Sequence, residues 1–143
     1  MIGKIYRLKK PAAKPESYLG ASVMEWSISG DKMWAMSSQC YVKEAIRCVE
    51  IELQKTGLRL IGKPSTPMSS GYHPELDISP LLEPAQANYY MSLIGILQWA
   101  VELGQIDTYI NVTLLLSYMA QPRVRHMNEI LHIFTSSLMK TPR

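Results

Sequence analysis

Apolar residues recur at helical spacing in four stretches of the chain, which predict four α-helices. With about 100° of rotation per residue, one face of Gln39–Thr56 is apolar and the opposite face is charged. Ala85–Leu103 is apolar on most faces, so we expect that helix to lie in a core. Further helices are predicted at about Thr108–Met119, capped by Asp107, and at Met127–Met139. The apolar face of the first helix comprises Tyr41, Val42, Ala45, Ile46, Cys48, Val49 and Leu53.

The segment ahead of these helices has the composition of a β-hairpin. Tyr18–Val23 contains strand-forming residues, Ser27–Asp31 has turn chemistry, and Lys32–Met36 is predicted as the returning strand. Ser37 or Ser38 can then offer a side-chain oxygen to the first amides of the following helix. The sequence therefore predicts an α+β fold, in which an N-terminal β-hairpin is followed by a mostly α-helical region.

A proline-rich stretch separates the first predicted helix from the second. Lys63–Pro84 contains five prolines and Gly71, a density that excludes a long helix and predicts an ordered loop or a linker. We interpret it as the boundary between residues 1–62, which hold the hairpin and the first helix, and the helical residues 85–143. Ahead of the hairpin, Gly3–Leu8 is expected to form a short strand or arm.

The composition is that of a globular protein, with 47% hydrophobic and 19% charged residues. At 143 residues the chain has room for one domain or for two small ones. The longest apolar run, Ala85–Leu103, is interrupted by five polar residues, which favours a buried helix over a membrane span. Cys40 and Cys48 lie eight positions apart on one predicted helix, which is too far for a disulfide. We expect two free thiols, packed as small apolar residues, in an intracellular and reducing compartment, with cytoplasm and nucleus not distinguished.

Charge is divided unevenly along the chain. Residues 1–63 hold eleven Lys/Arg and six Asp/Glu, residues 64–122 hold none and five, and residues 123–143 hold four and one. Basic segments therefore flank an acidic one, and the basic ends could bind a polyanion. An uneven but merely solvated surface would have the same charges, so the pattern alone leaves both interpretations open.

Several short motifs follow one another in a fixed order. Tyr18-Leu19-Gly20 opens the predicted hairpin, Trp34 and Ser37-Ser38 come next, and Tyr41-Val42-Lys43 begins the first helix. In their order and spacing these motifs resemble the copia-type retrotransposon reverse transcriptases, in the segment that follows the catalytic Tyr-x-Asp-Asp turn of that family. The chain departs from the family at Gln105-Ile106-Asp107, where Arg-Pro-Asp is usual.

The resemblance implies an activity for the parent protein and a gap in this chain. The parent activity would be RNA-directed DNA polymerisation, which needs carboxylates that hold Mg²⁺ ions. This chain contains no adjacent pair of acidic residues, so we expect the catalytic turn to lie upstream of Met1. The chain would then be a non-catalytic fragment, with no catalytic residue, no metal ligand and no cofactor of its own.

Two groups of residues would contact nucleic acid if the resemblance holds. Tyr18-Leu19-Gly20 matches the primer grip, where a glycine lets the backbone approach a sugar–phosphate chain and amides donate to phosphate. Lys43, Arg47 and Lys55 would reach the duplex backbone from the thumb-like first helix, responding to shape and phosphate rather than to sequence. The plainer interpretations are a glycine bulge beside a packed Tyr18, and ordinary solvated charge along the helix.

The resemblance also implies two partners. One is a primer–template duplex of RNA and DNA, and the other is the remainder of the reverse transcriptase, namely its palm and ribonuclease H regions. No membrane partner is expected. The alternative function is a small helical protein-interaction module, or a decayed retroelement remnant, without nucleic-acid binding.

A zinc pair is disfavoured because His126 and His132 lie six positions apart, whereas two ligands on one helix need three or four. Trp26, Trp34 and Trp99 are expected to be core residues rather than platforms for base stacking.

Overall fold

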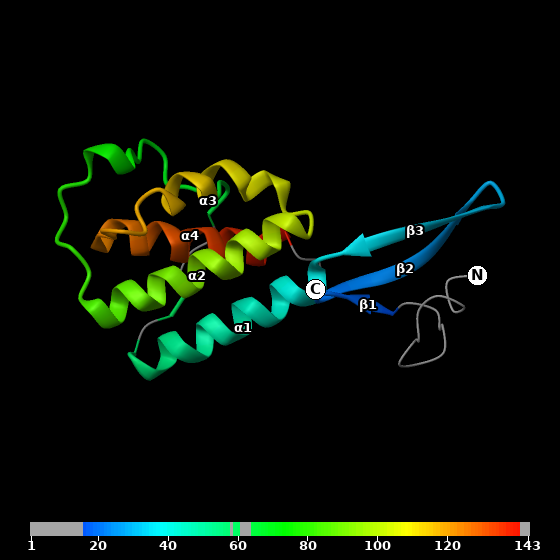
Figure 1. The fold of residues 1–143 in the computed structure, drawn as a ribbon, viewed down its shortest axis with the longest axis horizontal. Coiled ribbons are helices and arrows are strands. Elements are labelled where there is room, and N and C mark those ends of the chain that lie inside the picture. Colours follow the sequence, from blue (N-terminus) through cyan, green and yellow to red (C-terminus); the bar gives the residue numbers. More distant parts are fainter. Residues whose placement is uncertain (1–15, 58, 61–63, 141–143) are drawn as a thin grey trace, which may run out of the picture.

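The computed structural model describes residues 16–57, 59–60 and 64–140, with side chains as far as residue 136. Within these residues a three-stranded antiparallel sheet is followed by four α-helices, so the predicted α+β class is confirmed (Figure 1). The helices pack together into a body, and the two longer strands project from one end of it (Figure 1). The arm expected at Gly3–Leu8 lies outside the described residues.

The elements lie close to the stretches that the sequence predicts. In chain order they are β1 (Ser17–Tyr18), β2 (Ala21–Ile28), β3 (Asp31–Ser37), α1 (Gln39–Lys55), the 3₁₀ turn η2 (Pro74–Leu76), α2 (Pro84–Glu102), the 3₁₀ turn η3 (Ile106–Thr108), α3 (Tyr109–Leu116) and α4 (Val124–Lys140). Gly57 and Gly104 follow α1 and α2 with positive φ angles of 73° and 112°. Such a left-handed residue commonly ends a helix, and glycine adopts it without steric cost.

The sheet is a meander with two tight turns. β2 pairs with β1 on one side and with β3 on the other. The connecting pairs Leu19–Gly20 and Ser29–Gly30 have positive φ at both positions, 49° and 90° in the first and 53° and 94° in the second. A two-residue hairpin turn of type I′ requires this conformation, and its twist matches the twist of the strands. The continuous strand expected over Tyr18–Val23 is therefore wrong, because the first turn interrupts it.

The expected helix caps form only in part. The hydroxyl of Ser37 accepts a hydrogen bond from the first amide of α1 at 3.3 Å, as predicted for one of the two serines. Ser38, which immediately precedes α1, instead accepts a hydrogen bond from the Gln105 side chain at 3.2 Å. Asp107 does not cap the third helix, because it lies inside η3 and Thr108 precedes α3.

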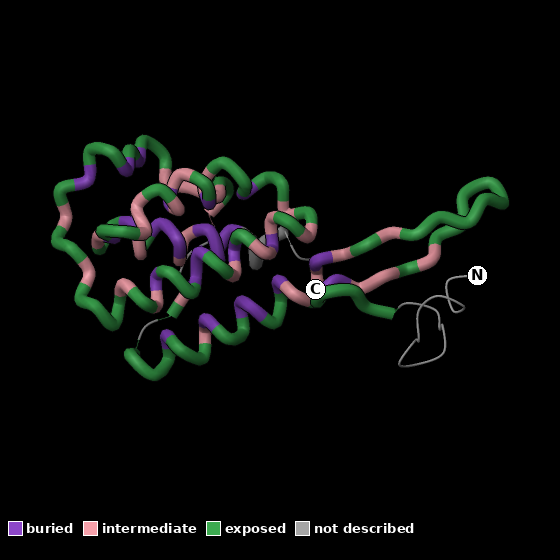
Figure 2. The backbone as a smooth tube through the Cα atoms, in the orientation of Figure 1, coloured by how far each residue is buried: buried purple, intermediate pink, exposed green. Residues whose placement is uncertain are grey.

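One hydrophobic core joins the four helices. Buried side chains of α1 pack in the same cluster as Tyr90 of α2, Leu115 of α3 and Phe134 of α4. Figure 2 shows buried positions recurring along the helices. Cys40 and Cys48 are free thiols, as expected, but both are exposed, so the expectation that they pack as small apolar residues is wrong. The predicted apolar face of the first helix is confirmed for its buried members Val42, Ala45, Ile46, Val49 and Leu53.

The proline-rich connection is an ordered loop that packs against α4. The Ser69 amide donates to the Glu129 carboxylate at 3.0 Å, and the Leu82 amide donates to the Pro122 carbonyl at 2.9 Å. The last residue of the predicted stretch, Pro84, already belongs to α2. The division of the chain into two units at this loop stays a prediction. Helices on both sides of the loop share one hydrophobic core, and any test of the division has to account for that core.

Strands β2 and β3 form an arm (residues 21–37) that extends beyond the helices with most of its side chains in solvent (Figures 1 and 2). Trp26 and Met33 are cross-strand partners on one face, and Trp34 lies on the other. Because the two tryptophans are 60% and 52% exposed, the expectation that they are core residues is wrong. Trp99, on α2, is partly buried.

Candidate nucleic-acid interface

The Leu19–Gly20 turn is held at the base of the arm by two helices. The indole Nε1–H of Trp99, in α2, donates a hydrogen bond to the Leu19 carbonyl at 3.1 Å. Gly20 lies against α1, where a Cβ atom would stand only 3.3 Å from Cδ2 of Tyr41. The Tyr41 hydroxyl donates in turn to the Ile96 carbonyl of α2 at 3.4 Å. The turn is thereby fixed relative to both helices.

The same turn presents its side chains to solvent. Tyr18 and Leu19 are 59% and 58% exposed, so Tyr18 is not packed. Gly20 is a turn residue rather than a bulge, because Tyr18 pairs directly with Ala21. A two-residue hairpin turn leaves the amides of its central residues outside the strand ladder, where they can donate to an anion such as a phosphate oxygen.

Replacing Leu19 with asparagine is expected to stabilise the protein by about 1 kcal/mol. Leu19 has a φ of 49°, a left-handed conformation in which Cβ crowds the backbone and which asparagine tolerates better. The control is Leu19→Ala, which keeps the left-handed crowding and should change stability by less than about 0.5 kcal/mol. Chemical denaturation measures both variants, and equal stabilities for asparagine and alanine would contradict the expectation.

Lys43, Arg47 and Lys55 are exposed on α1, and two of them are paired within the helix. Arg47 donates two hydrogen bonds to Glu44, at 2.6 and 3.0 Å, which lower the pKa of the glutamate. Lys55 donates to Glu52 at 2.6 Å. Pairs this open to solvent contribute little to stability, so a phosphate group could take the place of either carboxylate.

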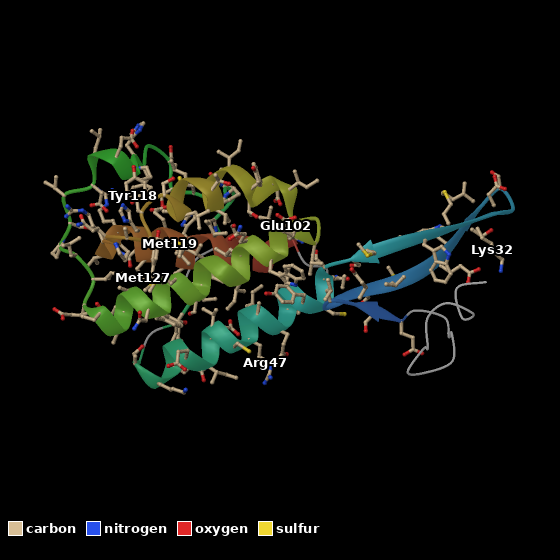
Figure 3. All side chains as sticks on the ribbon, viewed as in Figure 1. Lys32, Arg47, Glu102, Tyr118, Met119 and Met127 are labelled. Atoms are coloured by element: carbon tan, nitrogen blue, oxygen red, sulfur yellow. The ribbon has the colours of Figure 1, made fainter. Side chains whose placement is uncertain are left out.

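The structure brings the turn close to one half of α1 only. Tyr41, which contacts Gly20, lies within a few residues of Lys43 and Arg47. Lys55 is about 20 Å farther along the axis, at the other end of the helix. Figure 3 shows Arg47 on the side of α1 that faces away from the other helices. With three basic and three acidic residues, α1 has no net charge, so any phosphate binding would depend on individual side chains.

The arm adds exposed apolar and charged groups that extend away from the turn toward the tip. Trp26 stands opposite Met33, and Met24, two positions before Trp26, lies on the same face. On the other face Lys32 pairs with Glu25 at 2.9 Å, and Figure 3 shows Lys32 near the tip. A surface of this kind can stack on nucleic-acid bases or pack against protein, and the arm alone does not choose between them.

A buried polar cluster joins the loop around η2 to the start of α4, and no sequence motif predicts it. The side chains of Asp77 and His126 are 0% and 1% exposed, with Asp77 Oδ2 3.6 Å from His126 Nε2. His126 Nδ1 accepts a hydrogen bond from the Arg123 amide at 3.1 Å, so in the neutral ring Nε2 carries the proton. Asp77 Oδ1 accepts from the Ser79 amide at 2.8 Å. The Tyr118 ring packs on the imidazole with 4.6 Å between centroids, beside the start of α4 (Figure 3).

The two titratable groups of this cluster both favour their deprotonated forms. Burial lowers the pKa of His126 and outweighs the opposing effects of the Pro74 carbonyl and the Asp77 carboxylate. Burial alone would raise the pKa of Asp77. Hydrogen bonds from Ser79, together with the electrostatic effect of the nearby His126 and Arg125, instead hold that pKa below its usual value. The cluster is therefore a neutral imidazole beside an ionised carboxylate, and its contacts tie the loop to α4.

The described residues contain neither a metal-holding cluster nor a membrane-spanning helix. No three His, Cys, Asp or Glu side chains among the described residues are grouped to hold a metal ion. The His132 ring contacts the Thr66 carbonyl at 3.0 Å, on a different side of α4 from His126. Over the described ranges, no helix has both the length and the apolar character needed to cross a membrane.

Comparison with known proteins identifies no relative. No family model, no curated protein and no solved structure matches this chain. The resemblance to copia-type reverse transcriptases therefore depends on the quoted motifs alone, and the nucleic-acid-binding residues that it names stay predictions.

Proposed function

We propose that this chain is the duplex-gripping part of a copia-type reverse transcriptase, without catalytic residues of its own. The observation that supports this most is the Leu19–Gly20 turn, which lies where the resemblance places the primer grip. It combines a left-handed Leu19, a hydrogen bond from Trp99 and an exposed Tyr18. Backbone strain that the surrounding structure maintains is concentrated at functional sites.

The proposed contacts follow from the chemistry of the turn and of the adjacent half of α1. The amides of Leu19 and Gly20 would donate to phosphate oxygens of one strand, with the Tyr18 ring against a sugar. Lys43 and Arg47 would add charged contacts farther along the same backbone. Arg47 would exchange its exposed pair with Glu44 for a phosphate, which it can bind with two parallel hydrogen bonds. Such contacts respond to duplex shape rather than to base sequence.

The parent activity under this proposal is RNA-directed DNA polymerisation inside the cell. The Mg²⁺ ions and the aspartates that hold them would belong to the palm, and the ribonuclease H region would be a further neighbour. This chain would contribute a rigid, pre-positioned surface that keeps the primer–template duplex in place. Holding the primer end in the reactive geometry lowers the barrier to reaction at the active site.

A second candidate, a protein-interaction module without nucleic-acid binding, is favoured by one observation. The arm exposes Met24, Trp26, Ile28 and Met33 on a single face. An isolated two-stranded hairpin is only marginally stable, and contiguous exposed apolar side chains mark interaction surfaces. A partner protein that covers this face would give the arm the support that the helices do not provide.

Changing Lys43 and Arg47 together to alanine is expected to weaken binding of an RNA–DNA hybrid for all sequences alike. Each phosphate contact contributes roughly 0.9 to the log–log dependence of affinity on salt, so the slope should fall by about 2. Helix content should stay the same, because alanine favours helix. Fluorescence anisotropy of a labelled hybrid, titrated over a series of salt concentrations, gives both slopes.

The matched control removes the same charge elsewhere. Arg59 and Arg125 are exposed and lie outside the proposed interface, although Arg125 stacks over Tyr72 at 5.2 Å from the ring centroid. Their double change to alanine should reduce the slope by less than half as much as the α1 double change. Equal reductions would mean that only net charge matters. An unchanged slope for the α1 variant would reject this helix as the phosphate-facing surface and favour the interaction module.

A further inference from the structure

The apolar face of the arm comprises Met24, Trp26, Ile28 and Met33, which are between 45% and 60% exposed. Trp26 stands opposite Met33, and the three β2 residues are spaced by two positions, so all four side chains stand on one side of the ribbon. Within the arm, Asp31 is the only charged residue on this face, and it lies beside the turn at the tip. The face therefore has no cation to bind a phosphate, and it suits an uncharged part of a ligand.

The apolar face adjoins the part of α1 that carries Lys43 and Arg47. Ser22 lies at the base of this face, two positions before Met24, and its hydroxyl donates a hydrogen bond to Cys40 Sγ at 3.4 Å. Residues that are three, four or seven positions apart share one side of a helix, so Cys40, Lys43 and Arg47 lie on the same side of α1. The apolar face and this side of α1 therefore form one surface, which is continuous at the contact between Ser22 and Cys40.

The shape of the arm distinguishes between duplex grooves. A two-stranded ribbon fits a groove about 12 Å wide, whereas the minor groove of B-form DNA is only about 6 Å wide. The B-form major groove is wide enough, but its base edges present hydrogen-bonding groups, and of the four side chains on the apolar face only Trp26 has a strong donor. The minor groove of an A-form duplex is wide, shallow and lined by sugars, so it offers the uncharged surface that this face needs.

We propose that the apolar face of the arm lies on the minor groove of an A-form duplex and makes this chain selective for duplexes that contain RNA. Met24, Trp26 and Met33 contact the sugars of the groove, while Lys43 and Arg47 contact the phosphates that border it. This inference rests on the proposed duplex grip, and it adds the form of duplex that the grip accepts. Binding also covers apolar side chains that otherwise stay in solvent.

The test compares three duplexes of one sequence and length, which are RNA–DNA, RNA–RNA and DNA–DNA. RNA–RNA is A-form, and an RNA–DNA hybrid is closer to that form than DNA is. In fluorescence anisotropy at one salt concentration, the full chain should bind both RNA-containing duplexes with affinities within about threefold of each other and at least about tenfold above DNA–DNA. Equal affinity for all three, or an RNA–RNA affinity as low as that of DNA–DNA, would overturn the inference and leave the duplex grip standing. Failure to bind any duplex would reject the grip itself.

Matched variants on the two faces of the arm decide whether the arm causes the selectivity. Trp26→Ala combined with Met33→Ala should bring the affinities for the hybrid and for DNA–DNA to within about twofold of each other. Trp34→Ala combined with Met36→Ala removes the same two residue types from the opposite face, at positions of similar exposure, and should keep the parent ratio. A ratio that survives the first double variant, or that both double variants lose alike, would overturn the inference and favour a protein partner for this face.

Two further comparisons separate selectivity from phosphate binding and from folding. Lys43→Ala combined with Arg47→Ala should weaken binding of all three duplexes by similar factors, because phosphates border every duplex, and should keep the ratio. Amide hydrogen exchange checks that the arm of each variant stays paired. Where the first double variant loses that protection, Met24→Glu and Met36→Glu make the same comparison with one added charge on each face. Only Met24→Glu should lower the ratio, and equal ratios for these two variants would show that the apolar face does not contact the duplex.

Discussion

Changing Phe134 to alanine should lower the free energy of unfolding by about 3–5 kcal/mol, the usual cost of removing a buried phenyl ring. Phe134 is 2% exposed and belongs to the core that joins the four helices. It borders a small interior gap that Val42 of α1 and Leu97 of α2 also line. The variant would enlarge a void that already exists. Because a typical domain has only about 5–15 kcal/mol of stability, much of the total would be lost.

Urea denaturation of the parent chain and the variant measures this change. The control is Ile110→Ala, at an α3 position that is 76% exposed, which should stay within about 0.5 kcal/mol of the parent. The same experiment tests the division of the chain at the proline-rich loop. Coincident transitions by tryptophan fluorescence and far-ultraviolet circular dichroism would indicate one cooperative unit. Two separate transitions, with only one of them sensitive to Phe134→Ala, would support two units.

Helical periodicity predicts the parts of this fold in which local sequence and tertiary packing agree. Along α1, the buried Val42, Ile46, Val49 and Leu53 repeat every three or four residues, so the core-facing stripe can be read directly. Cys48 falls near the edge of that stripe and is exposed. Its exposure could not be predicted, because a helical wheel gives the direction of a side chain but not how much of that face the neighbouring helices cover. The class of the fold was therefore predictable, whereas exposure at the margins of each face was not.

The arm shows why burial is harder to predict for strands. Trp26 and Trp34 have a strong tendency to be buried, and in most folds a sheet face that carries them would be covered. Here the strands extend past the helices, so both side chains stay in solvent (Figure 2). A strand pattern states which residues share a face, but only the tertiary arrangement states whether another element covers that face.

The conformation of the candidate site could be predicted at Gly20 but not at Leu19. A glycine after Tyr-Leu signals a possible turn, whereas leucine rarely adopts positive φ, and propensity therefore favours a continuous strand. The hydrogen bond from Trp99 to the Leu19 carbonyl comes from a residue 80 positions later in the chain. Asp77 and His126 are likewise distant in sequence, and the proline-rich surroundings of Asp77 suggest an exposed loop. Contacts of this range leave no local pattern to recognise.

Acidification is expected to destabilise the protein in two steps that follow from the buried pair of Asp77 and His126. The pKa of His126 is lowered in the folded state, so below about pH 6.5 the unfolded chain takes up a proton that the folded chain does not. Stability should therefore be complete above that pH and fall as pH decreases, by at most about 1.4 kcal/mol per pH unit for this single group. The pKa of Asp77 is also lowered, so a second loss of the same sign begins near pH 4.

The geometry of the imidazole explains why protonation is costly here. Nδ1 accepts the Arg123 amide hydrogen at 3.1 Å, and a proton on Nδ1 would face that donor and break the bond. The nearby Asp77 carboxylate would attract the charged ring, but at 3.6 Å from Nε2 it lies beyond direct hydrogen-bond length. Desolvation of the charge and loss of the amide contact therefore act together against the imidazolium form.

Urea denaturation at a series of pH values from 8 to about 4 tests this expectation, with His126→Asn as the informative variant. The asparagine carbonyl can still accept the Arg123 amide, but it does not titrate, so the loss of stability between about pH 6.5 and pH 5 should become smaller. His132→Asn is the control, because that ring is only half-buried on α4 and contacts only the Thr66 carbonyl among the hydrogen bonds of the described residues. It should keep the pH dependence of the parent. A parent chain that is equally stable at pH 7 and pH 5, or a pH dependence that disappears in His132→Asn instead, would show that His126 is not the group that couples folding to protonation.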